Sequence, residues 1–383
     1  MLSIAHLTSA HPRRDTRIFV KQCRTLARQG YKVTLVVADG LGDERDSGVH
    51  ITDVGHHPGR LGRMLLGTRR VLRRARLIDA DIYHLHDPEL IPIGLRLKRL
   101  GKIVIFDAHE DLPLQILGKP HLAPALRRLL ASTCAAYERH ACRRFDAIVA
   151  ATPFIRDKFL QINPNTVNIN NYPMPTEFDA DAPWGEKQQE VCYVGGLSAM
   201  RGIGELVSAA QLLQSPARIT VAGRFSEVAL ENALSALPGW QRLNRPGHLD
   251  RDGVCALMAR SLAGLVTLHP EPNYLEALPV KMFEYMAAGI PVIASDIPLW
   301  HGIIQSNQCG VCVDPFDPAA IAAAIDYFVR HPHIASRMGR NGRRAILDKY
   351  NWPAEAEKLI RLYQELPAPA ANRRIADRHG ASG

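Results

Sequence analysis

Two glutamates, Glu276 and Glu284, stand eight positions apart in a segment that changes from loop to helix to buried strand. Pro279 fits the first turn of that helix, and Gly289 followed by Pro291 ends it. The free N–H groups and positive dipole end at the start of such a helix suit a phosphate group. Glu276 is expected in the entry loop and Glu284 about a turn and a half inside the helix, so that one carboxylate could hold sugar hydroxyls and the other ribose hydroxyls. The alternative is an amphipathic helix whose glutamates are solvated.

A second candidate binding element is the turn that contains Gly195 and Gly196 and is followed by Arg201. It lies between a strand predicted at residues 191–194 and a helix predicted at 202–214. Two glycines let a backbone approach a diphosphate closely, and the arginine supplies a positive fork for its oxygens. Taken alone, the same pattern is also that of an ordinary structural turn.

Polar residues also follow strands in the first half of the chain. His11 lies in the first loop, His86 and Glu89 follow the fourth predicted strand, and His109 follows the fifth. Because the carboxyl ends of parallel strands meet at one edge of a sheet, we expect these side chains at one rim. The alternative for His109 is a structural histidine with satisfied hydrogen bonds, and for Glu89 a solvated carboxylate in a loop.

Strands and helices alternate in both halves of the chain, which predicts two α/β domains of the doubly wound, Rossmann-like type. A strand at residues 2–8, a helix at 15–29 and a strand at 31–38 form the first βαβ unit. The expected parts are an N-terminal domain at 1–172, a linker at 173–187, a second domain at 188–350, a helix at 351–366 and a disordered tail at 367–383.

The Glu276–Glu284 pair, running into FEYMAAGIPVIASD, resembles the donor-site signature of the family 4 retaining glycosyltransferases. The resemblance implies the GT-B fold, in which two Rossmann-like domains face each other across a cleft. It also implies transfer of a sugar, with retention of configuration, from a nucleotide diphosphate sugar to a glycan or lipid-linked acceptor in cell-surface polysaccharide biosynthesis. Neither a metal nor another cofactor is expected, and the last helix is expected to cross back to the first domain.

By this resemblance the predicted catalytic residues are His109, Glu276 and Arg201. His109 matches the histidine that contacts the donor sugar in the family. The predicted donor-binding residues are Gly195, Gly196, Arg201, Arg224, Lys281 and Glu284, and the predicted acceptor-side residues are His11, His86 and Glu89. The family commonly has a basic pair in the glycine turn, and Gly196 stands here where the earlier arginine would be. We expect either Lys281 or Arg224 to supply the second positive charge.

The segment at residues 60–78 is rich in arginine and has no acidic residue, while apolar residues recur in it at helical spacing. Such a helix can lie on an anionic membrane with its arginines toward the headgroups. It can equally be a surface helix packed on the sheet. The arginines are Arg60, Arg63, Arg69, Arg70, Arg73, Arg74 and Arg76.

The net charge of +9 requires an acidic partner, and a nucleotide diphosphate, an anionic membrane and a nucleic acid all qualify. Aromatic residues make up only 6% of the chain, and no zinc-finger or single-strand-binding pattern is present, so we expect no nucleic-acid partner. A sugar-nucleotide epimerase on the same fold is the rival enzyme, and it would need no acceptor.

No apolar run approaches the ~18 residues needed to cross a bilayer, and the N-terminus has no basic region before its short apolar run. We expect a cytoplasmic protein, peripheral on the inner face of the plasma membrane. The seven scattered cysteines fit a reducing compartment, and a packing role for Cys309 and Cys312 is favoured over a metal or redox role. The Asp-x-Asp strings at 79–81 and 179–181 are interpreted as turns.

Overall fold

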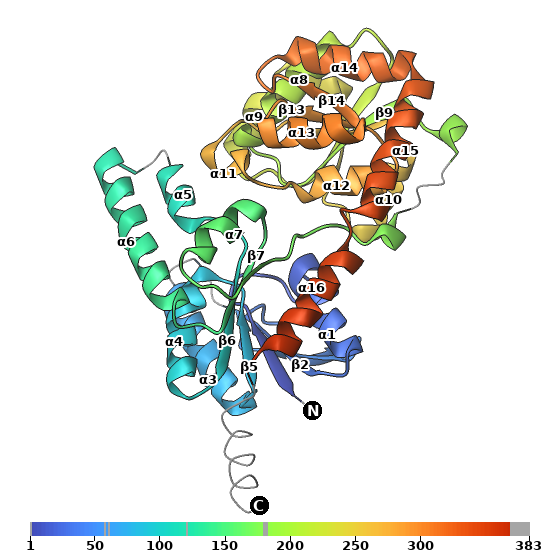
Figure 1. Cartoon of the computed structure of the whole chain (residues 1–383). Helices are drawn as coiled ribbons and strands as arrows, with labels where there is room; N and C mark the ends of the chain where they lie inside the picture. The colour runs from blue at the N-terminus through green and yellow to red at the C-terminus, as the bar shows by residue number, and fades with distance from the viewer. Residues whose placement is uncertain (1, 57–58, 60–61, 120–121, 179–182, 368–383) are drawn as a thin grey trace, which may run out of the picture. The chain divides into compact units, whose positions relative to one another are not determined.

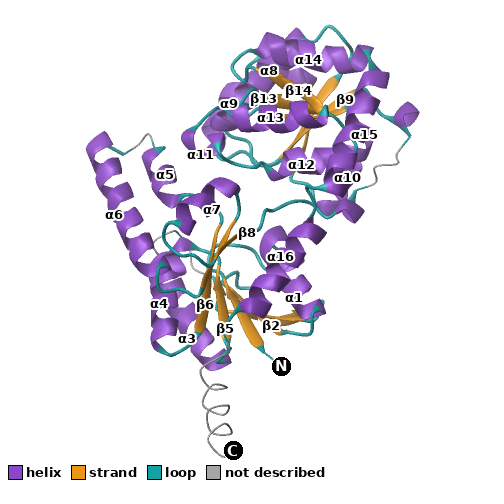
Figure 2. Ribbon diagram, in the orientation of Figure 1, coloured by secondary structure: helices purple, strands orange, loops and turns teal. Residues whose placement is uncertain are grey.

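The computed structural model describes residues 2–56, 59, 62–119, 122–178 and 183–367, and Arg60, Asp179, Asp181 and the predicted tail from 368 onward lie outside the described residues. The chain divides into two compact units. The first unit comprises Met1–Asn171 and Glu355–Gly383, and the second comprises Tyr172–Ala354. Each unit is a sheet with helices packed on both of its faces (Figures 1 and 2). This is the α/β, Rossmann-like organisation that the alternation of strands and helices predicts.

The first unit contains an eight-stranded sheet of order β3-β4-β2-β1-β5-β6-β7-β8, parallel except for the β3–β4 pair. Its central strands are buried on both faces and are therefore almost continuously apolar. The strands are β1 (Ser3–Leu7), β2 (Lys32–Val37), β3 (Glu44–Asp46), β4 (Val49–Asp53), β5 (Ile82–Leu85), β6 (Ile103–Ala108), β7 (Ala147–Ala150) and β8 (Thr166–Asn168).

Helices cover this first sheet on both sides. Figure 2 shows α3 and α4 on one side of it and α1 and α16 on the other. The helices are η1 (Thr16–Cys23), α1 (Arg24–Arg28), η2 (Arg63–Gly67), α3 (Thr68–Ile78), η3 (Pro88–Leu90), α4 (Ile91–Arg99), α5 (Leu112–Leu117), α6 (Pro124–Cys142), α7 (Pro153–Leu160) and α16 (Trp352–Glu365). Among the described residues, no helix combines the length and the apolar character needed to cross a membrane.

The second unit contains a six-stranded, parallel sheet of order β11-β10-β9-β12-β13-β14. Its strands are β9 (Glu190–Val194), β10 (Arg218–Ala222), β11 (Leu243–Gly247), β12 (Ala263–Val266), β13 (Val292–Ser295) and β14 (Gly310–Val313). Its helices are η4 (Pro175–Glu177), η5 (Trp184–Glu186), η6 (Ala199–Arg201), α8 (Ile203–Leu212), α9 (Val228–Ser235), η7 (Pro238–Arg242), α10 (Arg251–Arg260), α11 (Pro272–Leu275), α12 (Val280–Ala287), α13 (Pro298–Asn307), α14 (Pro318–Arg330) and α15 (Pro332–Asp348).

The structure differs from the sequence prediction in a few elements. The helix predicted at 15–29 begins as a π-helix, η1, whose start is capped by the Asp15 carboxylate, and becomes α-helical only at Arg24. Strand β11 was missed because it lies at the edge of its sheet, where exposed polar residues and a proline are tolerated. All seven cysteines are free thiols, and Cys309 is buried in the core of the second unit.

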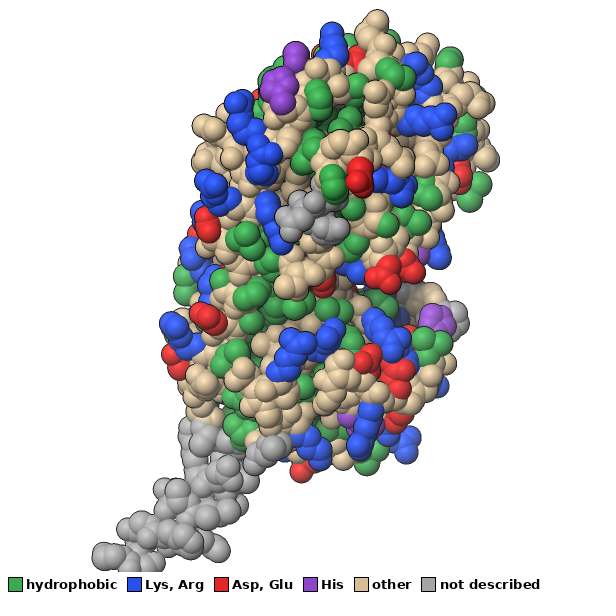
Figure 3. All heavy atoms as spheres, turned by 90° about the vertical axis from the view of Figure 1, so that its right-hand side faces the viewer, with side chains coloured by type: hydrophobic (Ala, Val, Ile, Leu, Met, Phe, Trp, Pro, Cys, Tyr) green, Lys and Arg blue, Asp and Glu red, His purple; other side chains and the backbone are tan. Residues whose placement is uncertain are grey.

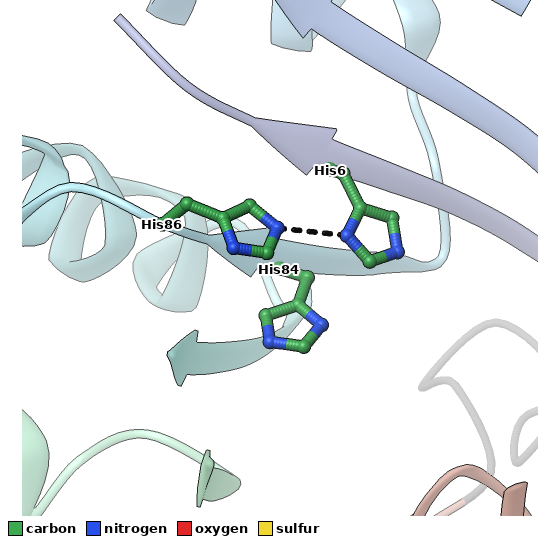
Figure 4. A group of neighbouring side chains, drawn as sticks. All are labelled: His6, His84 and His86. Carbon is green, nitrogen blue, oxygen red and sulfur yellow. Dashed lines mark hydrogen bonds between the residues drawn. The ribbon is translucent and has the colours of Figure 1, made fainter. Parts of the chain in front are cut away.

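Three histidines are buried in the first sheet. His6 in β1 is in register with His84 in β5, and His86 follows the end of β5. Their ring centroids lie 4.8 to 5.1 Å apart, and His6 Nδ1 and His86 Nε2 point at each other at 2.8 Å (Figure 4). Burial is the main cause that lowers the pKa of His6 and His84 well below the ordinary value, and it lowers the pKa of His86 to about 3.

Mild acid should therefore destabilise the first unit. Because the folded-state pKa of each histidine is depressed, the neutral rings contribute stability above pH 6.5, and this contribution is lost as the pH falls toward the folded-state values. For His86 the loss amounts to about 2 kcal/mol near pH 5. Urea denaturation at several pH values between about 7 and 5 should show the decline in the free energy of unfolding.

The variant His84→Gln should be less stable but should show a shallower pH dependence, since it removes one of the three buried groups. The matched control is His50→Gln, whose side chain is exposed on β4 and whose loss should leave the slope unchanged. Equal slopes for the wild type and His84→Gln would contradict the assignment of the acid sensitivity to these histidines.

Candidate functional site

The predicted glycine turn follows β9 and packs against a neighbouring loop of the second unit. Gly195 has φ of 134°, a conformation that suits glycine. A Cβ atom on Gly223, after β10, would collide with the carbonyl oxygen of Gly195. Both glycines are therefore required for the close contact of two backbones at the carboxyl ends of β9 and β10. The two glycines themselves place no side chain at this end of the sheet.

Two cations converge on this turn. A Cβ atom built on Gly195 would lie 3.1 Å from Lys281 Nζ, and one on Gly196 would lie 3.4 Å from a terminal nitrogen of Arg201. Lys281 is in the first turn of α12, so the start of this helix also faces the turn. Among the described residues, neither cation has a carboxylate partner within ion-pair distance. This arrangement suits an anion.

The ammonium group of Lys281 is the more unusual of the two. Its Nζ is buried, lies 3.6 Å from the centre of the Tyr193 ring and has no hydrogen-bond acceptor among the described residues. Burial, followed by repulsion from Arg201, lowers the pKa of Lys281 well below its ordinary value. Arg224 is exposed instead and lines a pocket of about 400 Å³ beside Gly195 and Gly196. Of the two residues considered for the missing charge, the structure brings Lys281 next to Arg201 and leaves Arg224 at the pocket wall.

Glu276 and Glu284 occupy different environments. Glu276 follows α11 in the entry loop and is exposed. Glu284 is in the second turn of α12 and is only 7% exposed. Its Oε1 accepts a hydrogen bond of 2.6 Å from Arg251, and the same guanidinium contacts Glu177 Oε2 at 2.5 Å. The hydrogen bond from Arg251 uses one of the two carboxylate oxygens of Glu284.

Sequence reasoning missed Arg251. It lies at the start of α10, 33 positions before Glu284, and has no motif around it. The one available signal was the expectation that a buried carboxylate has a cationic partner. Arg251 fixes the position of Glu284 by connecting it to Glu177 in η4.

The predicted residues of the first unit also lie together, at the carboxyl ends of β1, β5 and β6. The ring of His109 lies 5.2 Å from that of His11, measured between centroids, and His86 Nδ1 is 3.5 Å from His109 Nε2. His11 Nε2 is 3.4 Å from Asp87 Oδ1. Glu89 accepts hydrogen bonds from Ser9 and from Arg63. The expectation of one rim is met by the geometry, and the acceptor-side roles stay predictions.

His86 lies deeper than an acceptor-binding residue is expected to lie. Its side chain is 1% exposed, and its Nδ1 is 3.3 Å from Asp107 Oδ2. Asp107 is completely buried and also contacts His109 Nε2 at 3.1 Å. His109 keeps part of its ring exposed, so it is the residue of this group that can reach a ligand. His86 supports it from behind.

Some of these side chains are of types that bind metal ions. The His6, His84 and His86 group has its ligand atoms within 4.8 Å of one another, as does the group of His86, Asp107 and His109. In the first group the facing nitrogens of His6 and His86 are close enough to share a proton. In the second, both oxygens of Asp107 already accept from other side chains. Both groups fit hydrogen bonding better than metal binding.

The Asp-x-Asp string at 79–81 has structural contacts. Asp79 ends α3 in the left-handed conformation, and Asp81 accepts hydrogen bonds from the backbone N–H and the hydroxyl of Ser3. The interpretation as a turn is consistent with these contacts.

Two family models match the chain, one in its first half and the other in its second half. The model described as Glycosyltransferase Family 4 matches residues 16–169, and the model described as Glycosyl transferases group 1 matches residues 175–345. Among curated proteins, the chain is 26% identical over 251 residues to the alpha-D-kanosaminyltransferase of Streptomyces kanamyceticus. That match covers 60% of this chain and 63% of the relative.

Solved structures share the fold over nearly the full length. The sucrose-phosphate synthase of Thermosynechococcus elongatus has a TM-score of 0.77 at 19% identity and covers 95% of this chain and 99% of its own. HepE of Anabaena, solved in complex with UDP-glucose, has a TM-score of 0.71 at 14% identity, with 96% and 100% covered. At these identities the likeness concerns the fold.

The buried ammonium of Lys281 predicts that anion binding is linked to proton uptake. A diphosphate beside Nζ would raise the lowered pKa of Lys281, so the affinity should fall as the pH rises through the range in which the empty site loses its proton. We expect isothermal titration calorimetry with uridine and guanosine diphosphate sugars, in buffers of different ionisation enthalpy and at a series of pH values below the ordinary lysine pKa of 10.5, to show net proton uptake.

The variant Lys281→Met should abolish this uptake and weaken binding. The control Arg224→Met changes an exposed cation at the same pocket and should keep the uptake. The same proton uptake in wild type and Lys281→Met would remove Lys281 from the site.

Proposed function

We propose that this chain, which belongs to the family 4 glycosyltransferases of the GT-B fold, transfers a sugar from a nucleotide diphosphate sugar to a glycan or lipid-linked acceptor with retention of configuration. The observation that carries the proposal is the pair of cations, Arg201 and Lys281, at a glycine turn with no carboxylate partner in the described part of the chain. A diphosphate supplies the charge that this pair lacks. HepE, a structural neighbour, was solved in complex with UDP-glucose.

The proposed chemistry follows from the charges that develop when the anomeric bond breaks. Negative charge grows on the leaving diphosphate, and Arg201, Lys281 and the start of α12 stabilise it. Glu276 holds sugar hydroxyls, Glu284 holds the ribose, and His109 contacts the donor sugar. The acceptor attacks from the face of the leaving group, and the leaving phosphate helps to take its proton. The two cations supply positive charge at the phosphates, so we propose a reaction that needs no metal ion.

This proposal is tested by incubating the purified protein with nucleotide sugars and lipid-linked or soluble acceptors in the presence of a chelator. We expect acceptor-dependent release of nucleoside diphosphate and a product with the anomeric configuration of the donor. Conversion of the sugar without an acceptor would instead indicate the epimerase alternative, and an inverted product would contradict retention.

We further propose a peripheral location at the cytoplasmic face of the membrane, supported by the segment η2–α3. Val71, Leu72 and Ala75 of α3 are buried against the first sheet, as a packed surface helix requires. The exposed large apolar residues of the segment are Met64, Leu65 and Leu66 of η2 and Leu77 near the end of α3. On the face drawn in Figure 3, basic side chains are interspersed with acidic and apolar ones, which does not resemble a continuous nucleic-acid-binding stripe.

The two glutamates should have separable effects. Glu284→Ala should weaken binding of a nucleoside diphosphate by about 1–3 kcal/mol, because the ribose hydroxyls lose their acceptor in a buried site. A dideoxynucleoside diphosphate, which lacks those hydroxyls, should bind the wild type and Glu284→Ala equally. Glu276→Gln should leave nucleoside diphosphate binding intact and lower the rate of transfer. Calorimetry and initial-rate assays measure the two effects.

The control for Glu284 is Glu177→Gln, which disturbs the same Arg251 without touching the proposed ribose site. It should change discrimination between the ribo and dideoxy ligands little. If Glu284→Ala weakened both ligands to the same extent, the ribose contact would be wrong.

The membrane proposal predicts a specific loss on charge reversal. Arg69, Arg73 and Arg76 are exposed and have no ion pair among the described residues, whereas Arg74 pairs with Asp43 and Arg63 with Glu89. Arg70 is also exposed without an ion pair among the described residues, but it donates a hydrogen bond to the carbonyl of Val54 and is left unchanged. Reversing Arg69, Arg73 and Arg76 to glutamate should abolish co-sedimentation with anionic liposomes at low salt, because each contributes up to about 1 kcal/mol. Transfer to a short soluble acceptor should persist.

A matched variant with Arg218, Arg337 and Arg344 reversed in the second unit has the same net charge and should still co-sediment. Equal loss in both variants would show that only the overall charge matters, and undiminished binding of the first would refute the role of this helix.

A further inference from the structure

A single carboxylate organises the polar interior of the first unit. Asp107, near the end of β6, is completely buried and is surrounded by nitrogens of four side chains. Arg17 donates hydrogen bonds from Nε at 3.0 Å and from a terminal nitrogen at 2.7 Å, and Gln22 donates from Nε2 at 2.7 Å. His109 Nε2 and His86 Nδ1 face the same carboxylate at 3.1 and 3.3 Å. Of the four side chains, only that of His109 is partly exposed, so only His109 can reach a ligand.

We propose that Asp107 is a positioning residue for His109, and that it holds the His109 ring in the tautomer with the proton on Nε2. The ring then presents Nδ1 as a hydrogen-bond acceptor to a substrate hydroxyl. The inference rests on the proposed function for the identity of that hydroxyl, which belongs to the sugar being transferred. The tautomer is inferred from geometry, independently of the proposed function: His109 Nε2 lies nearer to the Asp107 carboxylate, at 3.1 Å, than to His86 Nδ1, at 3.5 Å.

The charge of Asp107 is what selects the tautomer. A carboxylate without a proton can only accept hydrogen bonds, so the nitrogen of His109 that faces it must carry a proton. Arg17 keeps Asp107 in this form, because its guanidinium binds both carboxylate oxygens, and its other terminal nitrogen donates to the carbonyl of Ile169 at 2.9 Å. The pKa of Asp107 accordingly lies well below its ordinary value, despite its burial.

The same logic fixes the histidines behind the site. His86 directs Nδ1 at Asp107, so that nitrogen carries the proton and His86 Nε2 is left as an acceptor. His6 Nδ1, 2.8 Å away, must then donate to it (Figure 4). Protons are thus ordered from His6 through His86 to Asp107, and none of these groups can rotate without losing a buried hydrogen bond. These buried contacts hold the side chains behind His109 in fixed positions.

An acceptor nitrogen on His109 has a chemical use. A neutral imidazole with a carboxylate behind it is a better hydrogen-bond acceptor than one in water, and the carboxylate stabilises any positive charge that develops on the ring. Near a sugar whose anomeric carbon becomes positive, an acceptor for a sugar hydroxyl is favourable, whereas the opposite tautomer would present a donor. Asp107 would therefore act on the reaction through His109 and not by touching the substrate.

The first test is spectroscopic and needs no activity. Long-range ¹H–¹⁵N correlation spectra of the full chain, labelled with ¹⁵N-histidine, report the tautomer of each neutral ring. The His109 signals are assigned from their loss in His109→Asn. We expect a protonated Nε2 and an unprotonated Nδ1 for His109 at neutral pH. The Nδ1–H tautomer, or an equal mixture of the two, would overturn the proposal whether or not the chain transfers sugars.

The second test asks whether Asp107 acts through His109. Asp107→Asn should lower kcat for transfer by about tenfold or more while nucleoside diphosphate binding to the second unit is unchanged, and in the His109→Ala background it should cause no further loss. The control is Glu110→Gln, an exposed carboxylate next to His109, which should alter neither kcat nor the tautomer. Independent, additive losses for Asp107 and His109 would overturn the positioning role.

The two tests separate this inference from the proposed function. If His109→Ala left transfer unchanged, the proposed role of His109 in the reaction would be wrong. The tautomer measured in the wild type would still show whether Asp107 orients the His109 ring. If Asp107→Asn did not fold, because it leaves the Arg17 guanidinium uncompensated, the spectrum of the wild type alone would decide.

Discussion

The interaction on which the first unit depends is the buried ion pair between Arg17 and Asp107. It joins η1 to the end of β6, and through the carbonyl of Ile169 it also fixes the segment that follows β8. Two charges removed from water are tolerated only when their hydrogen-bonding groups are nearly all used. Asp107 meets this condition by collecting Gln22 and two histidines as well, so one carboxylate is in contact with four of the polar side chains near this rim.

At the glycine turn of the second unit, by contrast, the charges of the described residues are not paired in this way. There Lys281 and Arg201 approach the same backbone, and no carboxylate in the described residues neutralises them. A buried ammonium without an acceptor is unfavourable, and a sequence selected for stability alone would not retain it. The nearby Glu284, which could have served as a partner, is held by Arg251. In the second unit Glu284 therefore pairs with Arg251, and Lys281 and Arg201 have no carboxylate within ion-pair distance among the described residues.

Much of this organisation could be predicted from the sequence, because it depends on local patterns. The alternation of strands and helices, the glycine turn and the loop before α12 are each encoded within a few residues, and the rule for parallel strands then gathers His11, Glu89 and His109 at one edge. The contacts of Asp107 with several side chains, and those of Arg251 with Glu284 and Glu177, could not be predicted in this way. Their partners lie 90 and 33 positions away, and only the folded chain makes those contacts. Strand β11 was missed since an edge strand lacks the apolar run that marks a buried one.

The distribution of paired and unpaired cations also bears on how the reaction would be driven. In the proposed reaction a diphosphate gains negative charge when the sugar leaves, so positive charge at Arg201 and Lys281 would attract the departing group more strongly than the intact donor. Arg201 keeps its charge throughout, whereas the charge of Lys281 depends on a pKa that burial lowers and that a neighbouring anion restores. Lys281 would therefore be fully charged only when a phosphate is beside it, and its contribution would be greatest at the stage where the leaving group carries the most negative charge.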